Sequence, residues 1–524
     1  MKKMKSILSL IAAVLLLSSC NSFLDRLPDD RTELNSVQKI NDILVSAYGT
    51  RDNCFIHKFM SDNVMYNGSS YTAQENEEKL WRFEDVQTEG NDDPRSVWND
   101  YYNAVATANT ILEAIDELGN HNGELNGQKA EALLCRAFAM WRLADIFCMA
   151  YDPTKNYPGL PYPTEVGKEY FDRGTLTELY DKINADIENA LAIYDDSHIP
   201  TAGIKYRFNR KAAYAFAARF NLLYHKWDKC IEYCNEVLGE NPFSVLRDWS
   251  QYATLGAADT GNLFANSGDP ANLFMHTAFS LAGRRLYAQS RYNHSTTCAS
   301  YETTWAYAPW GNGSGTGNAL WIANKMWGTN QGCSCYRIKE FFEYTDKVGG
   351  IGYAHIVMNE FSGDEVLLTR AEAYIMKNDF ASAVQDMNYW MQANGDQSRA
   401  AFPVFTVESV PETMKGFAES VVNPGSLNRL RTIKKSLHPQ GFEIDSVQLP
   451  YLQLVLHMRR IEQLYTGRRM TDIKRWGIEY THPTPDNPRP EDGDKEVFRA
   501  GDLRGAVQIP NDVIQAGIEP NPRN

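Results

Sequence analysis

Residues 209–242 read NRKAAYAFAARFNLLYHKWDKCIEYCNEVLGENP, and this stretch decides the fold. Its apolar residues recur at three- and four-residue steps, the spacing of one face of an α-helix. The first face consists of Ala213, Phe216, Ala217, Phe220, Leu223, Tyr224 and Trp227. A tight turn at residues 226–228 begins a second helix, which ends before Pro242 and carries Ile231, Cys234, Val237 and Leu238. The stretch therefore predicts a hairpin of two helices.

A second stretch, residues 363–391, repeats this plan further along the chain. Large, small, aliphatic and large residues recur in the same order in the second helix of each stretch: Trp227, Cys230, Ile231 and Cys234, then Phe380, Ala383, Val384 and Met387. These steps are similar to those of a tetratricopeptide helix hairpin. Such a hairpin cannot bury its apolar face alone, so we expect it to stack on its neighbours.

Helical patterns also fill the region before residue 209. Residues 96–150 predict two helices joined by a Gly- and Asn-rich turn at 119–127, and residues 176–194 predict another. The proline-rich segment between them, residues 152–163, is typical of an ordered loop. We therefore predict a mostly α-helical fold of tetratricopeptide-like hairpins.

The N-terminus carries the pattern of an export signal. Lys2, Lys3 and Lys5 precede an apolar run at residues 7–17, and small residues then lead to Cys20. The pattern resembles the lipobox of bacterial lipoproteins, in which the cysteine is acylated and becomes the new N-terminus. The run is shorter than the roughly 20 residues that a membrane span needs. We expect a signal peptide at 1–19 and a lipid anchor on Cys20; the alternative is an ordinary cleaved signal followed by a chance cysteine.

The charge of the chain excludes some partners. Loss of residues 1–19 removes three lysines and takes the formal net charge from −14 to −17. Nucleic-acid binding depends on a basic surface, so no nucleic-acid partner is expected. Without a polybasic patch, the lipid itself must provide the membrane anchor.

The cysteines predict no metal centre. Eight remain after Cys20, most of them in apolar helical contexts where cysteine behaves as a small hydrophobe. Cys333 and Cys335 could hold a metal, but no second Cys or His pair stands nearby at zinc spacing. A strained or absent disulfide is the preferred interpretation of this pair, and no metal or cofactor is expected.

Residues 243–360 interrupt the helical pattern with Gly-, Asn- and aromatic-rich sequence. We interpret this region as long loops and short elements inserted into the scaffold, and inserts of this kind are usually functional. Residues 287–336 contain nine Trp or Tyr but neither Phe nor Val. The bulky residues are thus those with a polar handle, which tolerate a half-wet site.

These rings predict a carbohydrate site. Sugar rings present axial C–H groups that stack on aromatic planes, while amide and guanidinium groups satisfy their hydroxyls. The candidate ligand-binding residues are Trp305, Trp310, Trp321, Trp327 and Tyr307, with a second cluster at Tyr71 and Trp81 and with Arg285 as a polar partner. Further polar candidates are Arg284, Arg291, Asn312, Asn324 and Asn330. The alternative is that the rings only pack loops onto the scaffold.

Catalytic constellations are not evident. The sequence has no G-x-S-x-G elbow, H-E-x-x-H motif or P-loop. A carboxylate pair of the glycosidase type is not recognisable from sequence. The acidic runs at 91–93 and 491–494 are interpreted as solvated loops. We therefore expect no catalytic residues.

Several segments together resemble the SusD/RagB family of nutrient-binding outer-membrane lipoproteins of Bacteroidetes. They are residues 20–25, 97–112, 129–138, 159–162, 363–374, 467–477, 509–510 and 521–522. Two positions depart from the family pattern: Arg459-Arg460 replaces Glu-Arg, and Thr466 replaces an acidic residue. We expect these positions to be structural, and the departures put local ion pairs in doubt.

The resemblance implies about four tetratricopeptide-like hairpins and an irregular ligand-binding half. It also implies an outer-membrane lipid anchor at the cell surface, a SusC-like TonB-dependent transporter as partner, and no general catalytic activity. The resulting division is 1–19 signal peptide, 20–95 N-terminal anchor and loops, 96–242 helical scaffold, 243–360 aromatic insert, 361–395 last hairpin, and 396–524 SusD-like C-terminal segment.

The function expected from these features is capture of a glycan and its delivery to the transporter. Three alternatives remain open. The same architecture could bind peptides, which would need an extended edge or a charged pocket. A surface glycoside hydrolase would need two facing carboxylates across an aromatic cleft. A pure interaction scaffold would have all four insert tryptophans buried.

Overall fold

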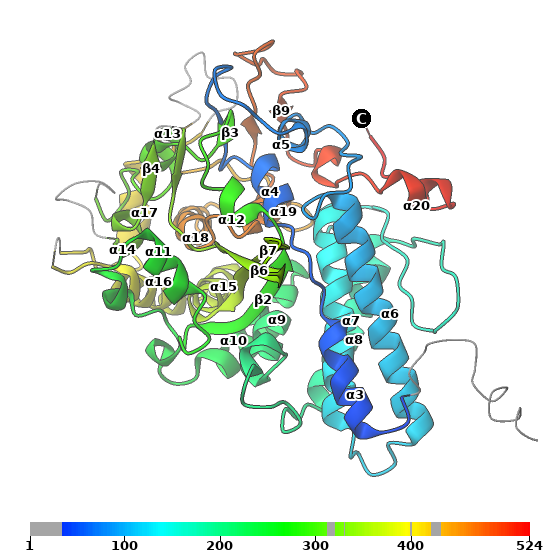
Figure 1. Ribbon diagram of the computed structural model, residues 1–524. Coiled ribbons are helices and arrows are strands. Elements are labelled where there is room, and N and C mark those ends of the chain that lie inside the picture. Colours follow the sequence, from blue (N-terminus) through cyan, green and yellow to red (C-terminus); the bar gives the residue numbers. More distant parts are fainter. Residues whose placement is uncertain (1–33, 312–319, 330, 399–400, 421–430, 524) are drawn as a thin grey trace, which may run out of the picture.

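The computed structural model describes residues 34–311, 320–329, 331–398, 401–420 and 431–523. Helix accounts for 46% and strand for 10% of the described residues, which confirms the predicted mostly helical class. The long helices of the N-terminal part lie on one side of the molecule, and the remaining hairpins lie on the other side together with the strands and shorter elements (Figure 1). No helix among the described residues combines the length and apolarity that a membrane crossing needs.

The N-terminal part contains the longest helices. α6 begins at Pro94, a favourable first-turn residue, and ends at Leu118; the next residue, Gly119, caps it with a left-handed φ of 75°. α7 packs between α6 and α8 and is buried on almost every side. The elements are α3 (Val37–Leu44), η1 (Val45–Ala47), α4 (Cys54–Met60), β1 (Met65–Tyr66), α5 (Glu75–Trp81), α6 (Pro94–Leu118), α7 (Asn126–Phe147) and α8 (Leu176–Ala192).

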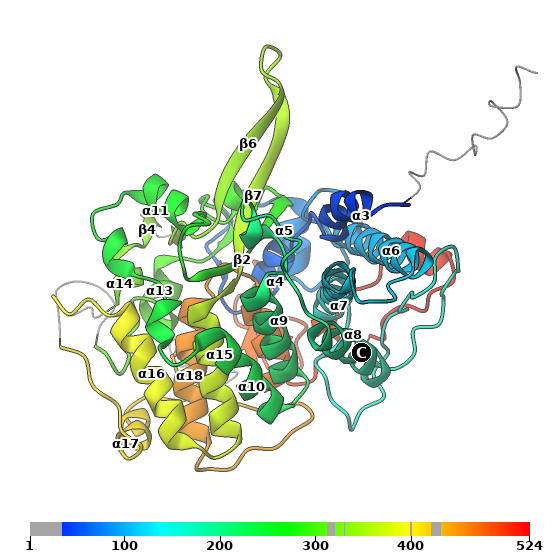
Figure 2. The same cartoon turned by 90° about the horizontal axis from the view of Figure 1, so that it is seen from below.

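The two predicted hairpins form and stack on each other. α9 (Arg210–Leu223) and α10 (Trp227–Leu238) make the first, and α15 (Gly363–Met376) and α16 (Phe380–Asn394) make the second. α10 packs directly on α15, so segments far apart in sequence lie side by side (Figure 2). Small residues such as Cys230, Cys234 and Ala383 are fully buried at these helix faces, which lets the helices approach closely. The prediction of stacked tetratricopeptide-like hairpins is confirmed.

The aromatic insert contains a sheet that the sequence analysis missed. β2 (Asn272–Phe279) pairs with β7 (Ile351–Ser362), and β7 pairs with β6 (Lys339–Asp346), all antiparallel. The interpretation of residues 243–360 as only loops and short elements is therefore wrong for these strands. The remaining elements are short: η2 (Ile204–Tyr206), η3 (Pro242–Ser244), η4 (Trp249–Tyr252), α11 (Ala257–Phe264), α12 (Ala282–Arg285), β3 (Tyr292–Asn293), α13 (Thr296–Glu302), α14 (Trp321–Asn324), β4 (Trp327–Thr329) and β5 (Gly332–Ser334).

One acidic run is also placed differently from expectation. Asp92 and Asp93 are buried, whereas the run at 491–494 is mostly exposed as predicted. Asp92 accepts hydrogen bonds from the Ser280 hydroxyl and from the Leu281 backbone N–H, the latter at 2.9 Å. Burial raises the pKa of Asp92 to about 6. The run at 91–93 thus attaches the N-terminal part to the insert instead of facing solvent.

The C-terminal segment closes the structure through a buried charge network. Its elements are α17 (Ser409–Lys415), α18 (Leu449–Glu462), α19 (Arg468–Trp476), β8 (Tyr480–Thr481), β9 (Val497–Phe498), η7 (Leu503–Gly505) and α20 (Asn511–Gln515). Arg459 lies 3.4 Å from Asp472, and Arg475 pairs with Glu372 at 2.7 Å. Arg459 and Arg460 are buried, as expected for structural positions, and each forms an ion pair, Arg459 with Asp472 and Arg460 with Glu302.

Candidate binding site

A pocket of about 210 Å³ brings together segments from across the whole chain. It is lined by Asp62, Val64, Met65, Tyr66, Trp81, Glu302, Arg431, Lys435, Glu479, Tyr480, Thr481, Pro483 and Pro488. The loop after α4, the end of α5, the end of α13 and strand β8 each contribute to it. Tyr66, Trp81 and Tyr480 form the aromatic part of its lining, the aromatic wall, and the charged side chains form the charged wall.

Trp81 anchors the aromatic wall as the last residue of α5. Its indole stacks on the His482 ring, with centroids 3.6 Å apart and planes within 10°, and on Tyr292 at 5.1 Å. The indole Nε1 donates a hydrogen bond to the Pro483 carbonyl at 3.2 Å. Burial lowers the pKa of His482 to about 4, so the imidazole beneath Trp81 is neutral at pH 7. This stack holds Trp81 in one orientation.

Tyr66 adds a more accessible ring to the same wall. β1 carries Tyr66 and pairs antiparallel with β3, which sets Tyr66 opposite Tyr292. The two rings tilt at 41° with centroids 5.9 Å apart, and the Tyr66 side chain is half-buried. Tyr66 is therefore the lining ring best placed to meet a ligand from solvent.

Glu302 organises the charged wall. Its carboxylate accepts from Lys435 Nζ at 2.8 Å and from Arg460 Nη1 at 3.1 Å, and Arg431 Nη1 lies 3.4 Å away. Burial opposes ionisation of this carboxyl, yet the three cations lower the pKa of Glu302. Glu302 is thus a fixed anion at neutral pH, unsuited to act as a general acid.

Asp62, another charged residue of the pocket, is likewise held by arginine side chains. Arg469 donates two hydrogen bonds to it at 2.8 and 2.7 Å, and Arg460 lies 3.3 Å away. Burial again opposes the charge, but the two arginines lower the pKa of Asp62 well below its ordinary value. The wall therefore offers fixed charges and donors beside flat rings, an arrangement suited to binding a polar ring-shaped ligand.

Trp305 and Trp321 are half-buried and pack against the core from the outside. The Trp305 Nε1 donates to the Ala323 carbonyl at 2.8 Å, which fixes Trp305 against α14. Trp321 is the first residue of that helix. These two predicted residues lie together, and each keeps part of its side chain accessible.

Trp310 and Trp327 have mainly packing partners. Trp310 is 4% exposed, and its indole is stacked on His457 at 5.4 Å with Trp390 at 5.9 Å. Trp327 is half-buried in β4 and meets the Tyr336 ring edge-on at 5.8 Å. Trp310 thus belongs to the core between the insert and the C-terminal segment.

Tyr307 is the most exposed predicted ring, at 65%, and its ring contacts the Phe417 ring at a tilt of 32°, with centroids 5.6 Å apart. Tyr71 is half-buried, and its carbonyl accepts from Arg291 at 3.0 Å. Arg285 is half-buried and lies 3.3 Å from Glu77. Among the eight predicted side chains, only Trp81 lines the pocket within the described residues. Cys20, the signal peptide, Asn312 and Asn330 lie outside the described residues.

The charged wall was not anticipated from the sequence. Glu302, Arg431 and Lys435 approach one another only through the fold, because they come from α13 and from the segment before α18. One signal was available: residues 429–435 read RLRTIKK, a basic run in an otherwise acidic chain. Such a run indicates either a surface patch or fixed partners for buried carboxylates.

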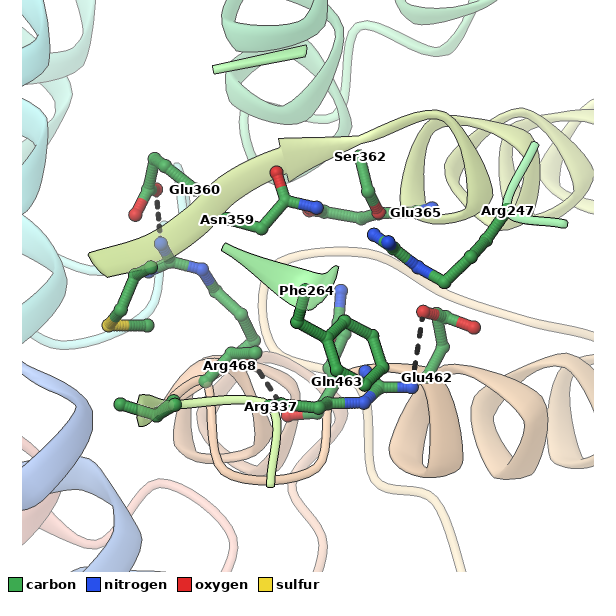
Figure 3. A pocket seen from close by; sticks show the side chains of 13 residues that line it. Arg247, Phe264, Arg337, Asn359, Glu360, Ser362, Glu365, Glu462, Gln463 and Arg468 are labelled. Atoms are coloured by element: carbon green, nitrogen blue, oxygen red, sulfur yellow. Dashed lines mark hydrogen bonds and ion pairs between the residues drawn. The ribbon is translucent and has the colours of Figure 1, made fainter. Parts of the chain in front are cut away.

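A second cavity, of about 40 Å³, is lined mostly by polar and charged side chains (Figure 3). Arg468 pairs with Glu360, and Arg337 Nη2 lies 3.4 Å from Glu462. Cys333 and Cys335 are buried free thiols in the same half of the molecule. The described residues contain no group of three metal-binding side chains placed to share an ion. The cavity is too small for a sugar ring, and the larger aromatic pocket is the candidate binding site.

The fold and the pocket define a class of protein: a helical-repeat scaffold that carries an aromatic and charged binding pocket. Comparison with protein families extends this result. Residues 22–222 match a SusD-like family described as "Starch-binding associating with outer membrane", and residues 282–504 match the SusD family. No protein of curated function matches the chain.

Solved structures agree with these family matches. A SusD superfamily protein from Bacteroides thetaiotaomicron is 17% identical, with a TM-score of 0.59 over 94% of this chain and 100% of that chain. A putative sugar-binding protein from Bacteroides vulgatus is 16% identical, with a TM-score of 0.60 over 94% and 99%. A SusD-like carbohydrate-binding protein from the same species is 14% identical, with a TM-score of 0.58 over 92% and 96%.

The chain belongs to the SusD/RagB family. Members of this family are binding proteins and not enzymes. This classification agrees with the pocket, where Glu302 and Asp62 are locked in ion pairs as permanent anions.

Proposed function

We propose that this protein is a cell-surface lipoprotein that captures an oligo- or polysaccharide and delivers it to a SusC-like TonB-dependent transporter. The observation that carries the proposal is the pocket that Trp81 and Tyr66 line together with Glu302, Arg431 and Lys435. Aromatic planes can stack on sugar rings, and charged donors and acceptors can satisfy hydroxyl groups. The descriptions of the matched family and of two similar structures support a carbohydrate as the ligand.

The proposed ligand surface extends from the pocket to the accessible rings of the insert. Tyr307 is its most exposed aromatic member, and Tyr66, Trp305, Trp321 and Trp327 are half-buried candidates. Tyr71 and Arg285 are further half-buried candidates. Trp81 acts mainly by positioning the wall, since it is 1% exposed. Trp310 is left out of the ligand surface because its ring is used for packing.

Affinity gels cast with starch, plant, fungal and host-type polysaccharides test the proposal. The mature soluble chain from Asn21 should be retarded by at least one glycan class. Tyr66→Ala and Tyr307→Ala should each weaken that binding by about 1–3 kcal/mol, the scale of a hot-spot aromatic. Phe171→Ala is the matched control, since Phe171 is an exposed ring (48%) outside the pocket. Retardation that neither tyrosine change alters would contradict the site assignment.

A peptide is the second candidate ligand, and the charged wall favours it. Arg431 and Lys435 could meet a peptide carboxylate, although both are already close to Glu302. Calorimetry with a defined peptide pool separates the two ligands. Heat from peptides, together with free migration in every glycan gel, would replace the carbohydrate proposal.

The anchor and the partner need separate experiments. Growth with labelled palmitate should label the full-length chain, and Cys20→Ala should abolish both the label and membrane retention. We expect a β-barrel transporter to co-purify with the lipidated chain from detergent extracts. An unlabelled wild-type chain would contradict the anchor without affecting the glycan proposal.

A further inference from the structure

The β6–β7 hairpin projects far from the body of the molecule (Figure 2). From Phe342 to its end, every residue of β6 is exposed. Large apolar side chains of both strands are open to solvent. Their exposed fractions are 42% for Phe342 and 52% for Tyr344 in β6, and 61% for Ile351 and 57% for Tyr353 in β7. Val348 at the turn is fully exposed. Apolar groups gathered in this way on a soluble protein mark an interaction surface.

β6 is an edge strand, and the register shows which of its backbone groups point outward. Phe279 of β2 donates its N–H to the Thr50 carbonyl at 2.9 Å, away from β7. His355, opposite Phe279 in β7, therefore directs its backbone groups to the other side, toward Phe341 of β6. The backbone N–H and C=O groups of Phe341 therefore point toward β7. Because direction alternates along a strand, the backbone groups of Phe342 face away from the sheet.

Only the outer half of this edge is open. At the base of the hairpin, α12 lies against β6: Arg284 pairs with Glu340 at 2.6 Å, and Gly283 packs on the Glu340 backbone. Beyond that point, no strand among the described residues covers the outer side of β6. The outward N–H and C=O groups of Phe342 and Tyr344 are thus free to accept another extended strand.

We propose that this edge pairs with β6 of a second copy of the chain, antiparallel and two-fold symmetric about Tyr344. Tyr344 then lies opposite the partner's Tyr344, and Glu343 lies opposite the partner's Thr345. No two like charges are directly opposed in this register. The contact is closed and uses the same surface on both copies.

Neighbouring registers are less favourable. Pairing centred on Glu343 would place two glutamates opposite each other, which is destabilising. Pairing centred on Phe342 would bring the turn of one hairpin against α12 of the other, since α12 flanks β6 at Glu340. Because the hairpin projects, the Tyr344 register keeps the two bodies apart (Figure 2).

Cysteine cross-linking tests both the pairing and its register. Opposed residues of a hydrogen-bonded antiparallel pair have Cα atoms about 5.5 Å apart, within disulfide range. Tyr344→Cys in the soluble chain should therefore form a covalent dimer under mild oxidation. Phe342→Cys is the matched control, because in this register its two copies are displaced by about 13 Å along the strands. The native cysteines of the described residues are all buried and do not compete.

We expect about ten-fold more dimer from Tyr344→Cys than from Phe342→Cys, since only the first pair meets disulfide geometry. Sedimentation equilibrium of the unmodified chain should show a mass that rises with concentration. Tyr344→Pro should abolish this rise, because proline removes an outward N–H without touching the bonds to β7. Val404→Ser, which changes an exposed valine (76%) outside the hairpin, should leave it unchanged. A strictly monomeric unmodified chain, or equal cross-linking of the two cysteine variants, would overturn the proposal.

Discussion

The helical scaffold and the aromatic insert bury their large residues by different routes. In the scaffold, Phe216 and Phe220 lie on one face of α9 and are buried against neighbouring helices. In the insert, Trp310 is held by His457 and Trp390, both far away in sequence. The first kind of burial follows from local periodicity and the second from the whole fold. Whether an aromatic ring in the insert packs or binds ligand can therefore be decided only from its contacts in the folded structure.

The two regions meet at Glu360, near the end of β7, and changing this residue should have the largest effect. Its carboxylate pairs with Arg219 at 2.6 Å and with Arg468, and it lies 3.5 Å from Arg142. Burial opposes ionisation, but these guanidiniums lower the pKa of Glu360 to about 2. Glu360→Leu leaves three buried cations without this partner, so we expect a loss of about 5 kcal/mol in the free energy of unfolding.

Urea denaturation measures this loss, and an exposed ion pair provides the control. Lys229 and Glu232 lie 3.2 Å apart on the surface of α10. Glu232→Ala should change stability by less than about 0.5 kcal/mol. A Glu360→Leu chain as stable as this control would mean that the insert and the scaffold are not joined through the charge network.

Trp310→Ala should have the next largest effect, and it separates packing rings from ligand rings. The indole is buried between His457 and Trp390, so its loss leaves a cavity and should cost about 3–4 kcal/mol. Glycan affinity of the folded fraction should stay the same. Tyr307→Ala should do the opposite, with stability kept and affinity reduced. If Trp310→Ala abolished glycan binding and left stability unchanged, Trp310 would have to be counted among the ligand-binding residues.

This contrast explains which parts of the fold and of the site could be predicted from the sequence alone. The hairpins at 209–242 and 363–391 were predictable because the apolar steps of a helix are local. The sheet was missed because burial in β7 does not follow the polarity of its residues: Glu360 is buried, whereas Val357 is only half-buried. Within the pocket, Trp81 was predicted. Glu302 and Lys435 were not, because no sequence pattern records that a distant lysine neutralises a buried carboxylate.

Two histidines, half-buried His225 in the scaffold and buried His482 in the C-terminal segment, should give a smaller effect that depends on pH. Burial lowers the pKa of both His225 and His482 from 6.5 to about 4. Between these values the unfolded chain binds more protons than the folded chain, so stability falls as pH drops. The contribution is complete above pH 6.5 and is lost as pH falls to about 4. Each histidine should account for roughly 2–3 kcal/mol.

Variants distinguish the two histidines by their effect on ligand binding. His482→Gln should flatten the acid limb of the stability curve and weaken the stack under Trp81, which reduces glycan affinity. His225→Asn should flatten the same limb and leave affinity unchanged, and asparagine tolerates the φ of 60° at this position. Urea titrations from pH 7.5 to about 4 provide the measurement, since that window spans both pKa values. Equal loss of affinity in both variants would argue against a special role for the Trp81 stack.

The smallest effect is expected where the insert returns to the scaffold, at the cap of α15. The Ser362 hydroxyl accepts a hydrogen bond from the Glu365 N–H at 3.2 Å, and Asn209 caps α9 in the same way through the Ala212 N–H at 3.2 Å. Ser362→Ala should cost about 1 kcal/mol, and Ser362→Thr should recover most of it because threonine also caps. Denaturation of both variants beside Asn209→Ala compares a cap at the junction with one inside the scaffold. Because each change removes one comparable hydrogen bond, similar losses would mean that the junction is as rigid as a scaffold helix. A much smaller loss at Ser362 would show that the insert can move against the hairpin that follows it.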